Sequence, residues 1–213
     1  MGYSKVELAN QALDAIGKDR IASLSETSTA ARKVNEVFDR TIESALARSH
    51  WSFCRKIASL SLLTNDWSER WAYKYDIPSD CVTVVRLVPT SDMRNHEPQL
   101  EYELMGGALY CNEPLAKAEY VFRTTNTTTM PVPFLDAVAF LLARNVSMPL
   151  TRKPSLWGNM NQMYEMQLGY AIEHDAGQEP TFYPQEAGGY IDDRNGTTGS
   201  GRSGSVDGSI YWE

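Results

Sequence analysis

The chain has 213 residues, of which 42% are hydrophobic, so it suits one domain with a sizeable core, or a domain with one insertion and a tail. Its formal net charge of −7 argues against a nucleic-acid grip, because phosphate binding normally needs a basic face. The longest mostly apolar run covers residues 132–143 and carries Asp136, whereas a bilayer crossing needs about 20 apolar residues, so no membrane span is predicted.

The first 50 residues predict two helices. Ser4 and Glu7 have the spacing of a capping box, and Gly17 tolerates the left-handed turn that often ends a helix, so a helix is expected over about 4–16. A second helix is expected from residue 27 or 28 to about residue 49. Its apolar stripe consists of Ala31, Val34, Phe38, Ile42 and Ala45. We expect these two helices to pack antiparallel.

A β segment follows, because β-branched and aromatic residues become frequent and turn signals arrive at short intervals. The predicted strands cover residues 56–63, 71–76, 82–88, 99–105, 108–111 and 117–123. The clearest signal is "YELMGGALY", in which Gly106 and Gly107 supply the positive φ angles that a tight hairpin turn requires. A hairpin is therefore expected at this point.

Helical character returns in the last third of the chain. Residues 134–146 are apolar nearly all round, as expected for a helix that is buried against several neighbours. Pro149 and Pro154 bracket a predicted short connection, and a last helix is expected over about 155–176. One side of that helix carries Leu156, Met160, Met163, Gln167, Tyr170 and Ala171, which predicts its packed face.

This order of elements predicts an α+β fold: a discontinuous four-helix bundle with an inserted small antiparallel β domain and an extended C-terminal tail. The predicted boundaries are 1–50 for the first half of the bundle, 51–128 for the β domain, 129–176 for the second half and 177–213 for the tail. The tail contains prolines, paired glycines and a Gly/Ser-rich stretch, so it is not expected to pack alone.

Signals for catalysis, cofactors and metals are weak. "GSGRSG" at 199–204 matches G-x-G-x-x-G, but no strand enters it and no helix leaves it, which favours a tether. The only histidines, His50, His96 and His174, lack metal-binding spacing. Cys54, Cys81 and Cys111 are widely spaced and are expected to be reduced, mostly buried thiols. We therefore predict no catalytic residue, no cofactor and no metal site.

Aromatic residues provide the candidate binding sites. Trp67, Trp71 and Tyr73 lie together in "NDWSERWAYKYD", where they form either the core of a small sheet or part of an interface. The candidate partner-binding residues of the tail are Phe182, Tyr183, Tyr190, Ile210, Tyr211 and Trp212. The last three follow a Gly/Ser-rich stretch, which favours a flexible tether that carries the adhesive segment "SIYWE".

The sequence resembles the head-to-tail adaptor family of short-tailed bacteriophages, of the tail tubular protein A type. The resemblance covers about residues 4–176 and depends on the order of several pieces rather than on any one of them. These pieces are the helix end at 15–17, the loop and long helix that end in "SHW" at 49–51, the run "YDIPSDC" at 75–81, the Gly-Gly hairpin, and an apolar helix followed by "MPLT".

The resemblance implies a non-enzymatic protein of the virion neck, assembled in the cytoplasm of the host bacterium. Members form a dodecameric ring under the portal protein, continue the DNA channel without sequence-specific binding, and offer a platform for the tail nozzle. Their C-terminal segments extend to the portal, which implies that the tail residues bind portal. Trp67, Trp71 and Tyr73 are then candidates for a subunit or nozzle interface.

Other functions stay open at this point. Another virion connector, such as a head-completion protein or a tail terminator, fits the same composition. A small hydrolase with Asp80 or Asp92 as its acid is the alternative from a different class, although no set of nucleophile, base and orienting residue is evident. The tail segment "SIYWE" could bind a neighbouring copy of the chain instead of the portal.

Overall fold

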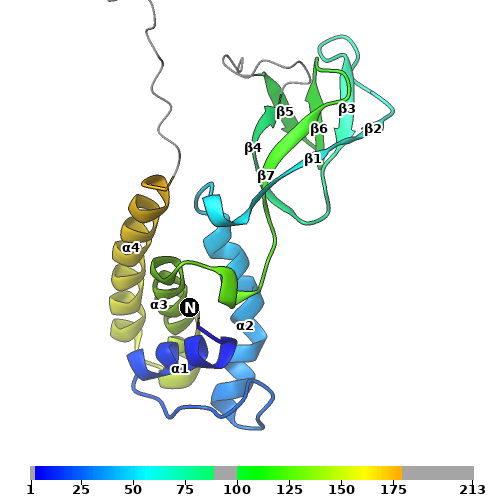
Figure 1. Ribbon diagram of the computed structural model, residues 1–213. Helices are drawn as coiled ribbons and strands as arrows, with labels where there is room; N and C mark the ends of the chain where they lie inside the picture. The colour runs from blue at the N-terminus through cyan, green and yellow to red at the C-terminus, as the bar shows by residue number, and fades with distance from the viewer. Residues whose placement is uncertain (1–2, 89–99, 179–213) are drawn as a thin grey trace, which may run out of the picture. The chain divides into compact units, whose positions relative to one another are not determined.

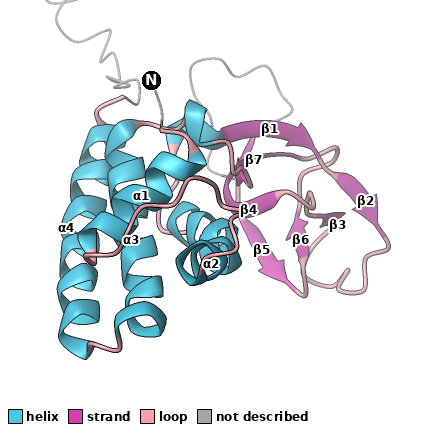
Figure 2. Cartoon of the chain, turned by 90° about the horizontal axis from the view of Figure 1, so that it is seen from below, coloured by secondary structure: helices cyan, strands magenta, loops and turns pink. Residues whose placement is uncertain are grey.

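The computed structural model describes residues 3–88 and 100–178, which all belong to one compact unit, Met1–Glu179. The described chain is a mixed α+β protein with four α-helices and two small antiparallel sheets (Figure 1). Helices and strands form separate groups rather than alternating (Figure 2). The predicted α+β class is therefore confirmed.

Helix α1 (Lys5–Ala15) begins and ends as its sequence predicts. The Ser4 hydroxyl accepts from the Glu7 backbone N–H at 3.2 Å, and the Glu7 carboxylate accepts from the Ser4 N–H at 2.7 Å, which completes the capping box. Gly17 has a φ of +66°, and the N–H groups that follow the helix donate back to the carbonyls of its last turn. Gly17 thus provides the left-handed residue of a Schellman closure.

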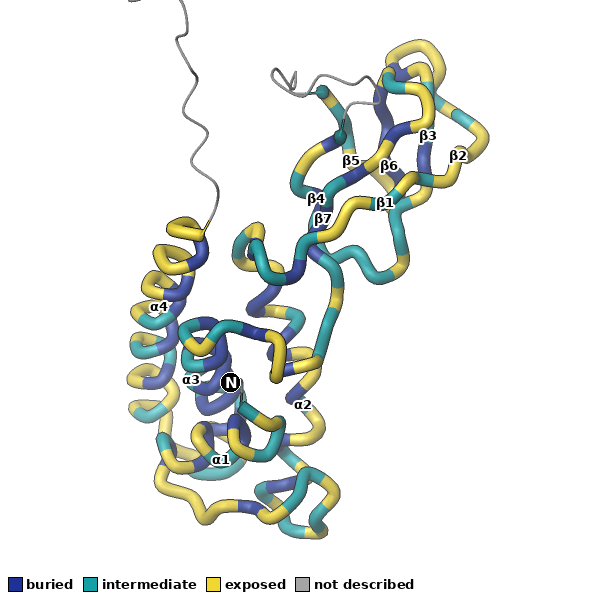
Figure 3. Tube along the Cα trace, viewed as in Figure 1, coloured by how far each residue is buried: buried dark blue, intermediate teal, exposed yellow. Residues whose placement is uncertain are grey.

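The other helices are α2 (Thr29–Leu46), α3 (Val132–Thr151) and α4 (Pro154–Ala176). Helix α3 packs against each of the other three, and 10 of its 20 residues are buried (Figure 3). Helices α1 and α2 pack mainly against α3 rather than against each other, so the expected antiparallel pairing of the first two helices is wrong. The physical reason is that α3 is apolar on nearly every side and can take a partner on each of them.

Two details of the last helices also differ from expectation. Helix α3 continues through Pro149, and the break comes at Arg152, whose φ of +55° is left-handed. In α4 the packed stripe is rotated relative to the predicted one, and Tyr170 is 56% exposed. The buried residues of α4 are Met160, Tyr164, Leu168, Ala171 and Asp175. Because α4 carries apolar side chains on more than one face, its periodicity alone did not decide which face is packed.

The strands match the predicted segments closely and form two sheets. The first sheet has the order β1-β7-β4, from β1 (Arg55–Ser59), β7 (Lys117–Phe122) and β4 (Cys81–Val88). The second has the order β2-β3-β6-β5, from β2 (Ser61–Leu63), β3 (Tyr73–Asp76), β6 (Ala108–Cys111) and β5 (Tyr102–Met105). All neighbours pair antiparallel.

The predicted strand 56–63 is divided between the two sheets. Leu60 separates β1 from β2, and its N–H donates to the carbonyl of Ala116 at 2.9 Å. β1 pairs with β7, whereas β2 pairs with β3, so one continuous stretch of chain changes sheets at this residue. The Gly-Gly hairpin between β5 and β6 is confirmed, with φ values of +59° and +79° at Gly106 and Gly107.

Trp51 lies at the junction between the helices and the strands. Its side chain is fully buried, its indole N–H donates to the Ala45 carbonyl at 3.1 Å, and its ring meets Phe134 edge-on at 4.9 Å between centroids. Val121 of β7 belongs to the same apolar core, so a strand contributes to the core that the helices share. The Asp175 carboxylate accepts from the Ser52 N–H at 2.9 Å, which joins the end of α4 to the start of the β segment.

By length and composition alone, one described helix could span a membrane, and that helix is α3, with a mean hydropathy of 1.2. In the structure 56% of its most apolar window is buried, and the other helices cover it. The core helix of a folded protein has the same composition. The packing of α3 is that of such a core helix.

Candidate interaction site

The predicted aromatic site lies at one end of the second sheet, and its best-packed member is Trp71. The Trp71 side chain is only 7% exposed, it packs with Ala108 and Tyr110, and its indole N–H donates to the Glu103 carboxylate at 3.2 Å. Trp67 is half-buried and meets the Tyr110 ring edge-on at 5.9 Å. The sequence allowed two roles for Trp71, the core of a small sheet or an interface. In the structure Trp71 belongs to the core of the sheet.

Arg70 is the exposed member of this cluster, and sequence reasoning did not single it out. Its guanidinium lies 5.3 Å from the Trp67 ring centre and 5.7 Å from that of Trp71, and its Nη2 atom lies 3.4 Å from the Glu103 carboxylate. The Arg70 side chain is 61% exposed. A cation held by two aromatic rings and one carboxylate is pre-organised for a partner at little cost in side-chain entropy.

Tyr73 does not join this cluster. It is half-buried and packs against a second small core, where its ring lies 6.2 Å from that of Tyr75. Tyr75 is almost fully buried, and its hydroxyl donates to the Glu113 carbonyl at 2.9 Å. The three predicted interface residues Trp67, Trp71 and Tyr73 thus divide between two packing clusters rather than forming one surface.

A hollow of about 620 Å³ runs beside the aromatic cluster and edge strand β5. Its lining consists of Arg70, Trp71, Leu100, Glu101, Tyr102 and Glu103. Three of these residues are aromatic or aliphatic and three are charged, a mixture that non-obligate contact surfaces share. The side chains that line it provide no nucleophile with an adjacent base.

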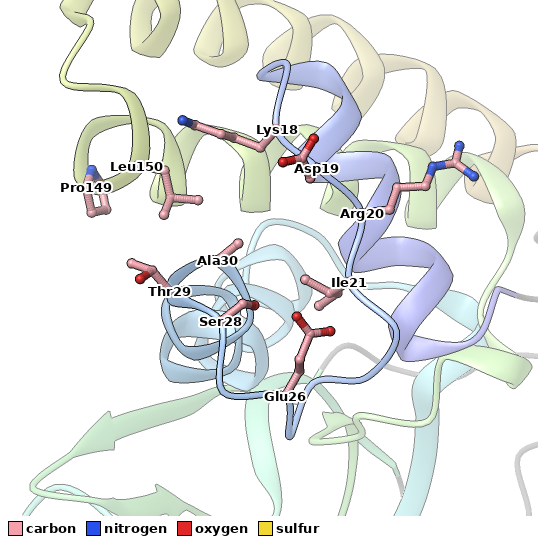
Figure 4. A pocket seen from close by; sticks show the side chains of 10 residues that line it. All are labelled: Lys18, Asp19, Arg20, Ile21, Glu26, Ser28, Thr29, Ala30, Pro149 and Leu150. Atoms are coloured by element: carbon pink, nitrogen blue, oxygen red, sulfur yellow. The ribbon is translucent and has the colours of Figure 1, made fainter.

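A second hollow of about 440 Å³ lies between the loop after α1, the start of α2 and the end of α3 (Figure 4). Arg20 points away from Pro149 (Figure 4). It binds Asp14, with 2.7 Å between the closest nitrogen and oxygen. The Glu26 carboxylate accepts from the Ala22 N–H at 2.9 Å, and this hydrogen bond lowers the pKa of Glu26. Arg20 and Glu26 therefore stabilise the loop between α1 and α2, and we assign the hollow a structural role.

Of the two candidate acids of the hydrolase alternative, Asp80 lies within the described residues, and its carboxylate is held as an ion. Its carboxylate binds the Lys56 ammonium and accepts from the Tyr120 hydroxyl at 3.0 Å. The hydrogen bond from Lys56 lowers the pKa of Asp80, whereas a general acid needs a raised carboxyl pKa. Lys56 also lies over the rings of Tyr120 and Phe122, at 5.4 and 5.2 Å from their centres. The arrangement is that of a structural ion pair.

Within residues 3–88 and 100–178, no group of three or more His, Cys, Asp or Glu side chains is placed to hold a metal ion. Cys54 and Cys111 are buried, Cys81 is half-buried, and all three are free thiols. Burial raises the pKa of Cys54 to about 12, and the nearby Asp175 charge acts in the same direction. A thiol of this kind is a poor nucleophile and a poor metal ligand at neutral pH.

The remaining site candidates lie outside the described residues. These are Asp92 and the tail residues Phe182, Tyr183, Tyr190, Ile210, Tyr211 and Trp212. Besides Arg70, the structure adds two features that the sequence did not predict: the carboxylate contact between Asp175 and Ser52, and exposed aliphatic side chains on the edge strands β2 and β5. The second had no sequence signal, since the uncharged run "IASLSLL" at 57–63 is equally typical of a buried strand.

Comparison with known proteins assigns no family: no protein-family model matches the chain, and no curated protein matches it.

Proposed function

We propose that this protein is a non-enzymatic structural component of a short-tailed phage virion neck. It acts as a head-to-tail adaptor: copies form a dodecameric ring on the portal protein, continue the DNA channel and carry the tail nozzle. DNA passes without sequence-specific binding. The particle is assembled in the bacterial cytoplasm, and the protein takes its place in the neck of the virion.

One observation supports this proposal most: segments far apart in the sequence share one apolar core, and the β segment lies between them in the chain. Leu13 and Ile42 from before the β segment belong to the same buried cluster as Leu142 and Leu168 from after it. This is the organisation that the adaptor resemblance implies. The description of these helices as one discontinuous four-helix bundle, with an extended tail, is part of the proposal.

The residues that carry the resemblance also occupy structural positions. Trp51 of the "SHW" motif is fully buried at the junction between helices and strands. Tyr75, the first residue of the "YDIPSDC" motif, is 2% exposed and ties β3 to the turn before β7 through its hydroxyl. Motifs that build a fold of this kind support a shared architecture better than scattered surface identities.

The proposed work of the tail is to anchor the ring. Burying Ile210, Tyr211 and Trp212 against the portal removes a few hundred Å² of surface, worth on the order of 5 kcal/mol before the cost of ordering the tether is subtracted. One tail of this kind binds weakly. Repetition around a ring makes the attachment durable, because every further tail binds at high effective concentration.

A portal pull-down tests the anchor. Deletion of residues 209–213 is expected to abolish portal binding while the protein stays folded by circular dichroism. Deletion of residues 199–203 is the matched control, since it removes the same number of residues from the Gly/Ser-rich stretch and keeps the anchor. Unchanged binding after the first deletion would contradict the anchor.

The acidic balance fits a channel if acidic residues line it, because repulsion of phosphate keeps DNA mobile during packaging and ejection. A ring structure with mainly Lys and Arg at its narrowest point would contradict this part of the proposal. The measurement is a cryo-EM map of the portal complex, from which the residues that face the DNA can be read directly.

Size-exclusion chromatography with and without portal separates the proposal from its alternatives. A chain that forms a ring only on the portal supports the adaptor, whereas a stable hexamer without portal favours a tail terminator. The hydrolase alternative has the least support, because Asp80 is held ionised by Lys56 and Tyr120. Arg70 and the half-buried Trp67 remain our candidates for the surface that meets the nozzle or a neighbouring subunit.

A further inference from the structure

The second sheet has two edges that carry exposed aliphatic side chains. Among the described residues, β2 and β5 are its edge strands, with β3 and β6 between them. Leu62 and Leu63 of β2 are 63% and 40% exposed, and Leu104 and Met105 of β5 are 48% and 45% exposed. An edge with unpaired backbone groups and apolar side chains is a template for another strand unless charges or prolines protect it.

Strand β2 is the last part of a stretch of chain that lacks the residues which normally protect a sheet edge from pairing with another strand. β1 and β2 are consecutive in the chain and each forms one of the two outer strands of its sheet, and residues 57–63 have no charge, proline or glycine. Ile57 is 56% exposed. Leu115 is 77% exposed and has a φ of +55°, and it precedes Ala116, whose carbonyl accepts from the Leu60 N–H. A bulky residue in the left-handed region is uncommon, so an exposed leucine there is consistent with a contact role.

Strand direction decides which edges can join when copies follow each other head to tail. The second sheet has four antiparallel strands, so its two edge strands run in opposite directions. A neighbouring copy in a similar orientation therefore brings its β5 antiparallel to β2. The first sheet has three antiparallel strands, so its edges would meet parallel, which is the slightly less stable pairing.

The geometry points to a head-to-tail sheet between copies of this chain: β2 of one copy pairs antiparallel with β5 of the next. The leucines of β2 then lie against Leu104 and Met105, next to the hollow of about 620 Å³ that borders β5. This inference deepens the proposed ring and rests on it for repetition of the contact. The strand pairing itself needs no portal and can be tested alone.

The area involved makes the pairing weak in a single pair of copies. The four exposed side chains cover a few hundred Å² in total, whereas a stable interface buries about 1,600 Å². A contact of this size forms and dissociates rapidly in solution, and it accumulates only when a ring closes or a partner holds the copies together. A covalent trap is therefore the appropriate assay.

The primary test is disulfide trapping between two singly substituted proteins. A tagged Leu62→Cys chain is mixed with an untagged Leu104→Cys chain and oxidised, and covalent products are separated on non-reducing gels. Strand pairs that lie opposite each other have the Cα separation that a disulfide requires. The expected result is a tagged–untagged dimer that exceeds, by at least about tenfold, that of the unsubstituted chain with its three native thiols.

Met166→Cys is the matched control, because Met166 is 45% exposed but lies on α4 rather than on a strand. Its mixture with the Leu104→Cys chain is expected to give only background dimer. Absence of excess dimer from the Leu62 and Leu104 pair would overturn the inference. Equal amounts of the Leu62 homodimer would also overturn it, since that product indicates a two-fold edge contact instead of a head-to-tail one.

Charge exchange tests the same contact in the portal complex. Leu62→Lys and Leu104→Glu are each expected to lower the yield of ring on portal by about tenfold, and the double variant L62K/L104E is expected to restore it. Wild-type yield from both single variants would overturn the inference while leaving the adaptor intact. A wild-type chain that never binds portal would refute the adaptor, and the disulfide trap would still decide the strand pairing.

Discussion

Replacing Asp175 should reveal how strongly the end of α4 is tied to the β segment. The Asp175 side chain is 7% exposed, and its carboxylate accepts from the Ser52 N–H at 2.9 and 3.2 Å and from the Ser52 hydroxyl at 2.7 Å. Hydrogen bonds to a charged group contribute about 1.5–3 kcal/mol each. Asp175→Ala also leaves a Ser52 N–H without its partner. We expect this variant to lose about 2–4 kcal/mol of unfolding free energy.

Urea denaturation followed by circular dichroism and tryptophan fluorescence measures this loss. Asp175→Asn keeps the shape and removes the charge, so about half of the loss is expected. Asp39→Ala is the matched control, because Asp39 binds Lys5 with its side chain 66% exposed, and such surface pairs contribute about 0–1 kcal/mol. If Asp175→Ala cost no more than Asp39→Ala, the proposed tie between α4 and the β segment would be refuted.

Three further outcomes are expected. Gly107→Ala should destabilise the protein by about 1–2 kcal/mol in urea, because φ is +79° there, whereas Gly169→Ala in α4 should stabilise it by up to about 1 kcal/mol, since the added methyl meets no atom within 4 Å. Cys54 should react with a thiol reagent at pH 8 only after denaturation, because burial raises its pKa to about 12; rapid labelling of Cys54 itself in the native protein, identified by peptide mass spectrometry, would contradict this. Because the pKa of Asp80 is lowered in the folded protein, its ion pair stabilises the fold fully above about pH 3.9, and this stabilisation is lost as the pH falls through the folded pKa. Lys56→Gln removes the ion pair, so the free energy of unfolding of this variant should fall less steeply in acid than that of the wild type. An unchanged dependence of the unfolding free energy on pH would count against the ion pair.

Local chemistry explains why much of the fold could be predicted. The capping box at Ser4, the glycine at the end of α1 and the paired glycines of the hairpin each act within a few residues of chain, so their sequence is sufficient to place them. The strands followed from alternating β-branched and aromatic residues with turn signals between them. Local signals do not show that residues 56–63 divide at Leu60. This division depends on which distant strands pair with each half, so the sequence did not predict it.

The candidate site was only partly predictable. Sequence proximity brought Trp67, Trp71 and Tyr73 together, but the two tryptophans precede β3, whereas Tyr73 is its first residue and packs in another cluster with Tyr75, two residues further along the strand. The position of Arg70 over two tryptophan rings depends on how the loop folds back after β2. Exposure of the leucines on β2 could not be read from their composition, since a buried strand has the same residues.

The sequence by itself determined the α+β class, the caps and turns, and the positions of most strands, because these depend on backbone preferences and short-range hydrogen bonds. Only the tertiary structure decided that α1 and α2 pack on α3 rather than on each other, that Trp71 is core, and that Asp175 reaches Ser52. The physical reason is that an apolar side chain records only a preference for burial. Which partner buries it depends on shape and distance across segments that are remote in the chain.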